Sequence, residues 1–142
     1  MKKQILIYCI LGFFMLGFSI RSLAQNNKVV LSENSNPKNP TFVITEEMPA
    51  FPGGESERIK FMQQNLVYPV VAKLNGVQGT VYAQFVVDKR GKVVEAKILK
   101  GIGSGCDEEC LRIIKIMPRW KPGRVNGKKV RVLFNMPVCF TL

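Results

Sequence analysis

The longest alternation of apolar and other positions runs from Val130 to Phe140. Its even positions hold Val130, Val132, Phe134, Met136, Val138 and Phe140, and its odd positions hold Arg131, Leu133, Asn135, Pro137 and Cys139. Because side chains alternate between the two faces of a strand, the run predicts a strand of about ten residues with one apolar face. Pro137 cannot donate to a ladder and Arg131 is charged, and both features are typical of sheet edges. The pattern therefore predicts an edge strand on which a partner peptide could pair.

Two further alternating runs stand earlier in the chain. Val81, Ala83, Phe85 and Val87 form the apolar side of the first, and Val94, Ala96 and Ile98 that of the second. The residues between them, Asp88-Lys89-Arg90-Gly91, are typical of a turn. The two runs predict a β-hairpin.

Three segments show helical spacing. In 55–65 and the residue that follows, Ile59, Met62 and Leu66 recur at helical spacing. A second, short segment follows Pro69 and stops at Gly76, with Val70, Val71 and Leu74 expected to face inward. The third segment starts with three acids, as the helix dipole favours, and its apolar stripe consists of Cys106, Cys110, Ile113, Ile114 and Met117.

The order helix, short helix, strand, strand, helix, strand predicts an α+β fold, a three-stranded antiparallel sheet with helices packed on one face. We assign residues 46–142 to this domain, which is large enough for one modest core. Residues 25–45 are rich in Asn, Ser and Pro and are expected to form a flexible linker.

Residues 1–24 have the pattern of a secretory signal peptide. Lys2 and Lys3 precede the apolar stretch Ile5 to Ile20, and Ser22-Leu23-Ala24 offers a cleavage site. The alternative is a retained membrane anchor, since the apolar stretch is only slightly shorter than a usual membrane span. In both cases the domain is exported. The formal charge of the whole chain is +11, and cleavage after Ala24 would lower it to +8.

The chemistry of the chain does not favour an enzyme. It has no histidine, the commonest general base and transition-metal ligand. Cys106, Cys110 and Cys139 match no common zinc spacing and are interpreted as small buried apolar residues, with a disulfide or a reactive Cys106 as the alternatives. The glycines at 101–105 lead into a helix that begins with acids, which would repel phosphate. We expect no catalytic site, metal or cofactor.

The segment from Arg112 to Arg131 contains eight Lys and Arg and no acid. It forms either a solvated basic face or a surface that steers an acidic partner. Export argues against nucleic acid as that partner.

Together, several motifs resemble the C-terminal domain family of TonB, the periplasmic energy transducer, in the form common in Bacteroidetes. They cover residues 48–140: PAFPGG, then YPVVAKLNGVQG, the DKRG turn, WKPG at Trp120 to Gly123, and the closing GKKVRVLFNMPVCF. The combination is specific, although each piece alone is common.

The resemblance implies a periplasmic domain that binds the N-terminal TonB box of an outer-membrane transporter. In the family the box adds as a strand to the edge of the last strand, here Val130, Arg131, Val132, Leu133, Phe134, Asn135 and Met136. Outward side chains Arg131, Leu133 and Asn135 would tune the pairing. A second family segment approaches the transporter plug, and it corresponds here to Asn65, Leu66, Val67, Tyr68 and Pro69. Trp120 and Phe134 fall on aromatic positions of the family, which we interpret as core packing.

Two alternatives remain open. If residues 1–24 are retained, the resemblance implies an anchored energy transducer that also contacts proton-motor proteins of the inner membrane. If edges of two copies pair instead, the domain is a self-pairing module that forms a homodimer.

Overall fold

The computed structural model describes residues 30–31, 38 and 40–142, so the predicted signal peptide lies outside the described residues. Helices α2 (Glu55–Asn65), α3 (Val70–Leu74) and α4 (Cys106–Lys115) agree with the three predicted helical segments. The strands are β1 (Val30–Leu31), β2 (Thr41–Ile44), β3 (Gly79–Val87), β4 (Val93–Lys100), β5 (Arg124–Val125), β6 (Lys128–Lys129) and β7 (Arg131–Phe140). No helix in this described part is long and apolar enough to cross a membrane.

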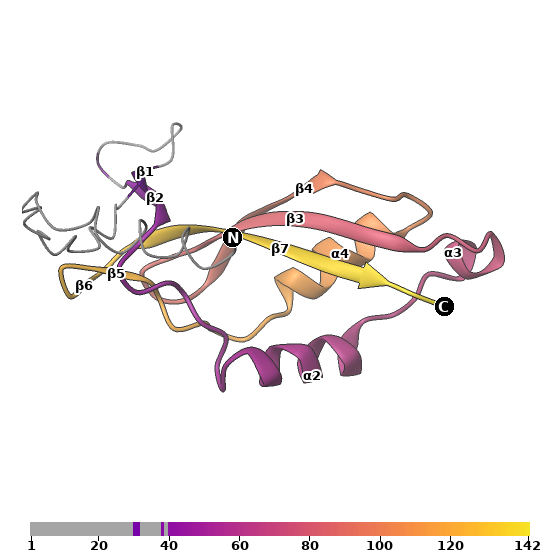
Figure 1. Cartoon of the computed structure of the whole chain (residues 1–142), viewed down its shortest axis with the longest axis horizontal. Coiled ribbons are helices and arrows are strands. Elements are labelled where there is room, and N and C mark those ends of the chain that lie inside the picture. Colours follow the sequence, from indigo (N-terminus) through magenta and orange to yellow (C-terminus); the bar gives the residue numbers. More distant parts are fainter. Residues whose placement is uncertain (1–29, 32–37, 39) are drawn as a thin grey trace, which may run out of the picture.

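Strand β7 lies inside a sheet of order β1-β2-β7-β3-β4 (Figure 1). It pairs antiparallel with the whole of β3, from Gly79↔Phe140 to Val87↔Val132, without a register shift. Strand β4 pairs antiparallel with β3 and completes the predicted hairpin. The α+β class and the three antiparallel strands predicted from the sequence are confirmed.

Two short strands extend the sheet beyond β7 and lie within the predicted linker. Strand β2 pairs in parallel with the start of β7, at Thr41↔Arg131 and Phe42↔Val132, and β1 pairs antiparallel with β2. Ordered structure therefore begins before Glu46, and the linker prediction is wrong for residues 41–44. The reason is that Thr-Phe-Val-Ile favours a strand but is too short to show alternation.

The helices enclose an apolar core against one face of the sheet. Helix α4 buries Cys106, Cys110, Ile113 and Ile114, and α2 contributes Phe61 and Met62. An aromatic cluster fills the middle, where the Trp120 ring lies 5.5 Å from Phe85 and 5.1 Å from Phe134, between ring centroids. The predicted core role of Trp120 and Phe134 is confirmed, because Trp120 is 4% exposed and Phe134 packs on the same core.

Helix α3 buries a different residue from those predicted. Val70, Val71 and Leu74 are exposed, whereas Ala72 is fully buried. A helix of five residues can turn only one position fully towards a neighbour. Tyr68, just before α3, already fills the adjacent space, with its ring 5.7 Å from that of Phe140.

Helix α2 also exposes one residue of its predicted apolar stripe. Ile59 is 46% exposed, while Met62 and Leu66 pack on the core as predicted.

Strand β4 also departs from the predicted alternation. Its register with β3 shifts twice, and Glu95 has a φ of 53°. Val94 therefore lies opposite Val86, while Val93 takes the inward place beside Val87. A β-bulge of this kind inserts one residue and reverses the side-chain faces on one side of it.

Candidate partner-binding edge

The outer edge of β7 is free of other strands over most of its length. One edge of β7 is paired with β3, and the other is paired with β2 at Arg131 and Val132 alone. From Leu133 to Phe140, no strand of the described residues covers that outer edge. Main-chain donors and acceptors of an uncovered edge can pair with an added strand.

The residues available for pairing lie closer to the C-terminus of β7 than the predicted range Val130 to Met136. Val130 precedes β7 and donates its N–H to the Gly123 carbonyl at 3.0 Å. Arg131 and Val132 are paired with β2. Of the predicted residues, Leu133, Phe134, Asn135 and Met136 therefore remain on the uncovered part, and Pro137 to Phe140 join them. The sequence could not show this, because β2 comes from a segment ninety positions away.

The side chains of β7 alternate as predicted. Val132, Met136, Val138 and Phe140 are buried, and Phe134 packs against the core, on the face that the helices cover. On the opposite face, Arg131 donates to Thr41 Oγ1 at 3.3 Å and to Glu95, and Asn135 Oδ1 accepts from Gln84 Nε2 at 2.9 Å. Arg131 and Asn135 are thus held on the sheet surface by neighbouring strands. Their partners lie within the sheet itself.

Strand β4, at the other side of the sheet, offers a poorer template. Its two register shifts interrupt the regular spacing of main-chain groups, and Lys97 and Lys100 are exposed along it. Bulges and lysines are devices that protect sheet edges from unwanted pairing. Among the described strands, the second half of β7 is therefore the more suitable edge for a partner.

A groove lies between α2 and the end of β7. It has a volume of about 370 Å³, and its lining residues are Arg58, Ile59, Met62, Gln63, Leu66, Pro137, Val138, Cys139 and Thr141. Helix α2 packs on the core through Phe61 and Met62, which leaves Ile59 at the groove. Ile59, Gln63 and the residues after Met136 were not predicted as site residues, since only the tertiary arrangement brings α2 to β7.

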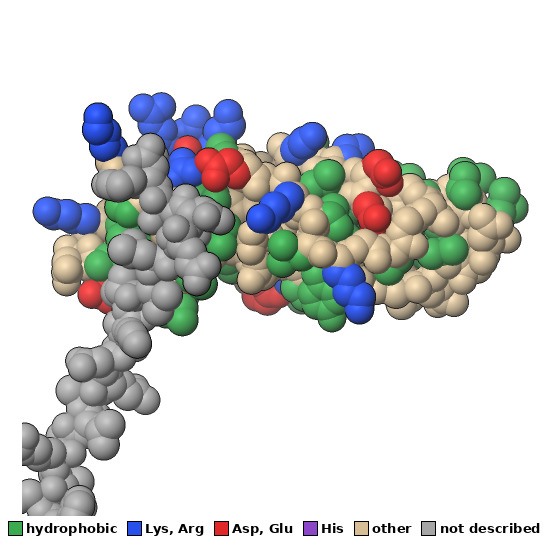
Figure 2. Space-filling model, turned by 90° about the horizontal axis from the view of Figure 1, so that it is seen from above, with side chains coloured by type: hydrophobic (Ala, Val, Ile, Leu, Met, Phe, Trp, Pro, Cys, Tyr) green, Lys and Arg blue, Asp and Glu red, His purple; other side chains and the backbone are tan. Residues whose placement is uncertain are grey.

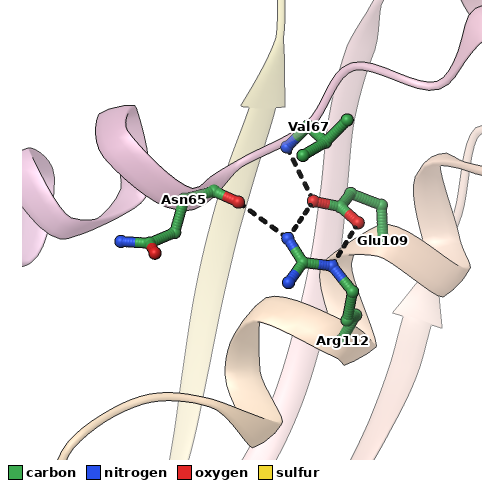
Figure 3. Close-up of polar contacts among 4 residues, drawn as sticks. All are labelled: Asn65, Val67, Glu109 and Arg112. Atoms are coloured by element: carbon green, nitrogen blue, oxygen red, sulfur yellow. Dashed lines mark hydrogen bonds and ion pairs between the residues drawn. The ribbon is translucent and has the colours of Figure 1, made fainter.

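The second predicted segment, Asn65 to Pro69, is fixed by two residues of α4 (Figure 3). Arg112 donates to the Asn65 carbonyl at 2.7 Å, and Glu109 Oε1 accepts the Val67 N–H at 2.7 Å. Arg112 also donates to Glu109, and this hydrogen bond lowers the pKa of the Glu109 carboxyl. The connection between α2 and α3 is therefore held on the body of the domain.

The second predicted segment lies beside the C-terminal end of β7, beyond the predicted pairing range Val130 to Met136. Leu66 lines the same groove as Pro137 and Val138. Tyr68 contacts Phe140 and donates its hydroxyl to the Val77 carbonyl. Val67 is 62% exposed and points away from the core. The predicted β7 residues, Val130 to Met136, do not line this groove, so the structure does not bring the two predicted parts together there.

The two ends of the domain differ in surface chemistry (Figure 2). At α3, the large apolar residues Val67, Val70, Val71 and Leu74 are exposed. At the opposite end (Figure 1), the β3–β4 turn, the residues flanking Trp120 and strand β6 carry exposed cations that we call the basic end: Lys89, Arg90, Lys92, Arg119, Lys121, Lys128 and Lys129. Trp120 joins its segment to the β3–β4 turn by donating to the Gly91 carbonyl at 2.8 Å. None of these seven has an ion pair with a described residue.

The three described cysteines are free and differ in exposure. Cys106 and Cys110 are fully buried, as interpreted from the sequence, but Cys139 is exposed. Burial raises the pKa of Cys106, and it raises that of Cys110 to about 12. Because the thiolate is the reactive form, neither buried thiol is suited to nucleophilic chemistry.

Comparison with known families decides which kind of domain this is. The family model described as "Gram-negative bacterial TonB protein C-terminal" matches residues 64–142. The chain belongs to this TonB C-terminal family. The matched region contains α3, β3, β4, α4 and β7, and therefore the three antiparallel strands predicted from the sequence and the uncovered edge. No curated protein and no solved structure matches the chain.

Membership of the TonB family connects the chain with energy-coupled transport. Domains of this family are periplasmic, are associated with transport rather than catalysis, and interact with outer-membrane transporters. Strands β1 and β2 and most of α2 precede the matched region, and the last two residues of α2, Gln64 and Asn65, fall inside it. They nevertheless shape the edge, since β2 covers its start and α2 flanks its end.

Proposed function

We propose that this TonB-like domain acts in the periplasm and binds the N-terminal TonB box of an outer-membrane transporter as an added strand along β7. The observation that supports this is the uncovered edge from Leu133 to Phe140, beside a full antiparallel partner in β3. A guest strand there would extend the sheet by main-chain hydrogen bonds. Asn65 to Pro69 would contact the transporter next to the box.

Pro137 indicates which main-chain groups face the guest. Strand β7 pairs with β3 through Tyr82↔Pro137 without a break, so the missing N–H of Pro137 belongs on the outer side. Successive residues of an antiparallel strand direct their main-chain groups to opposite edges. Leu133, Asn135 and Cys139 would therefore offer both a donor and an acceptor to the guest, and Pro137 an acceptor alone.

The test is a titration of isotope-labelled domain with a synthetic TonB-box peptide from an outer-membrane transporter. We expect amide shifts to change along Leu133 to Phe140 and to stay constant along β4. Two N-methylated versions of the peptide provide the control, one methylated at its odd positions and the other at its even positions. Each version lacks the N–H groups along one edge of the bound peptide, and only one of these edges faces β7. One version should bind as the parent does and the other should fail. Equal binding by both, or unchanged β7 shifts, would contradict strand addition.

Two measurements separate this proposal from the alternatives. Intact mass of the exported protein shows whether residues 1–24 are removed, and retention would place the domain on an anchored transducer that contacts the proton-motor proteins. Sedimentation at high concentration tests self-pairing, because a strand-exchanged homodimer would occupy the same edge of β7. We expect a monomer whose edge is available to the peptide.

A further inference from the structure

We propose that the groove between α2 and the end of β7 receives one aliphatic side chain of the guest strand. This inference rests on the proposed strand addition and deepens it. Main-chain pairing along β7 would accept almost any extended peptide, whereas a side-chain pocket would select among them. The domain would thus recognise a partner that carries a leucine-like residue at one position of the added strand.

The position of the groove follows from strand geometry. An added strand would lie roughly 4.8 Å beyond β7, with side chains directed alternately to the two faces of the sheet. Those on the helix-covered face would be directed towards α2. Val138, which is buried on that face, and Ile59 of α2 both line the groove. A side chain of the guest that points to this face therefore enters between them.

The chemistry of the lining favours an aliphatic occupant. Ile59, Met62, Leu66, Pro137 and Val138 are apolar, and no acid is among the lining residues. Arg58 is the one charged lining residue, and its guanidinium is paired with Glu55. Ile59 is 46% exposed in the domain alone, and a guest side chain would remove this surface from water.

The groove is of a suitable size for a side chain. Its volume of about 370 Å³ is near the lower end of the roughly 300–1,000 Å³ of small-ligand pockets. The uncovered edge runs directly along it, since Pro137 to Cys139 belong to both. Groove and edge therefore form one continuous surface, and the guest strand is the occupant that reaches both.

A leucine scan tests the inference on a TonB-box peptide in which every apolar residue is replaced by threonine. Leucine is then returned to one position at a time, and affinity and β7 shifts are measured. We expect one position to bind about tenfold more tightly than the rest, as burial of an aliphatic side chain predicts. The Ile59→Asp variant should lose this preference while still showing β7 shifts.

Ile116→Asp is the matched control, because Ile116 is 47% exposed and does not line the groove. It should keep the preference for the same position. The Ile59→Phe variant, which fills the groove, provides a second test and should also lose the preference. Circular dichroism would verify that all three variants are folded.

Cys139 allows an independent measurement of the register. It is exposed on the face opposite Val138, and it is the only described cysteine that is not buried. Each peptide would carry one cysteine, placed at successive positions and activated as a mixed disulfide with an aromatic thiol. The Cys139 thiolate would attack the peptide sulfur, forming a disulfide with the peptide and releasing the aromatic thiolate. Since faces alternate, the trapped position and the preferred leucine position should differ by an odd number.

The outcomes distinguish the groove from the strand addition itself. If every leucine position binds equally while β7 shifts persist, the groove selects nothing and the inference is wrong, although strand addition stands. If the Ile59→Asp variant keeps the preference for one leucine position, the groove inference is likewise wrong and strand addition again stands. If no peptide perturbs β7, strand addition fails and the inference falls with it.

Discussion

At the scale of single residues, Gly91 lies where the β3–β4 turn meets the loop of Trp120. Its φ is +79°, and a Cβ built there would lie 1.9 Å from the Trp120 carbonyl oxygen. Gly76 has a similar φ of +62° but no neighbour within 4 Å of its Cβ. We expect Gly76→Ala to cost about 1 kcal/mol from backbone strain, and Gly91→Ala about 3 kcal/mol or more, because the loop must also move. Urea unfolding of both variants measures the difference, and equal costs would contradict the close approach.

Glu109 gives the stability of the domain a dependence on pH. The hydrogen bond from Arg112 lowers the pKa of Glu109 below the ordinary value of 4.5, so its stabilisation is complete above that value and is lost as pH falls through the lowered pKa. We expect Glu109→Gln to destabilise the domain by about 1 kcal/mol at neutral pH, with the difference shrinking in acid.

The control for this prediction is Glu108→Gln, since the exposed side chain of Glu108 makes no hydrogen bond or ion pair with another described residue. Its stability should match that of the parent at neutral pH. Amide exchange gives a second reading, because Val67 donates to Glu109 and should exchange faster in Glu109→Gln alone. An unchanged Val67 rate would show that the carboxylate does not hold this segment.

The cysteines predict a selective labelling pattern. A thiol reagent should modify Cys139 in the native domain, because that side chain is exposed. Cys106 and Cys110 are fully buried, so they should react only after denaturant is added. Peptide mapping by mass spectrometry assigns each site. Native labelling of Cys106 would restore the interpretation of a reactive thiol.

At the scale of elements, α3 shows why apolar spacing alone is insufficient. Val70, Val71 and Leu74 follow a helical pattern, yet the pattern cannot indicate whether a neighbour is present to cover them. In the structure they are exposed, and Ala72 is the buried residue. Strand β7 was predicted correctly because each inward residue is packed on the core opposite a β3 residue.

This difference predicts opposite effects for two substitutions in α3. Leu74→Ser should change the free energy of unfolding by about 0.5 kcal/mol or less, since Leu74 is 82% exposed. Ala72→Leu should destabilise by about 1–3 kcal/mol, because added methylenes would enter a filled core. Thermal unfolding measures both. A large loss for Leu74→Ser would indicate that the helix is packed in the way predicted from the sequence.

The candidate site was only partly visible in the sequence for a related reason. The alternation from Val130 to Phe140 identified the strand, but the prediction of an edge strand is wrong at Arg131 and Val132, which β2 covers. Its uncovered length depends on β2, a four-residue strand without alternation, and its groove depends on the packing of α2. The bulge at Glu95 was also hidden, because a positive φ at a non-glycine residue leaves no mark in the composition. Tertiary contacts therefore set the limits of the site.

At the scale of the whole molecule, charge is distributed unevenly (Figure 2). Nearby acids are engaged in contacts of their own: Asp88 accepts from the turn amides of Arg90 and Lys92, Glu47 pairs with Arg124, and Glu95 pairs with Arg131. The seven cations of the basic end also outnumber these three acids, so its net charge is positive. Such a surface increases the association rate of an acidic partner, and salt reduces the effect.

We therefore expect the basic end to accelerate binding of a transporter N-terminal segment that carries acidic residues beside its TonB box. Reversing Lys128 and Lys129 to Glu should lower the association rate constant about tenfold at low salt and leave the dissociation rate nearly unchanged, because both lysines are exposed and distant from the groove. Reversing Lys97 and Lys100 on β4 makes the same change in net charge elsewhere and should slow association less. Stopped-flow measurements from low to physiological salt would separate the two. If both pairs slow association equally, only net charge matters, and if neither does, the basic end is simply solvated.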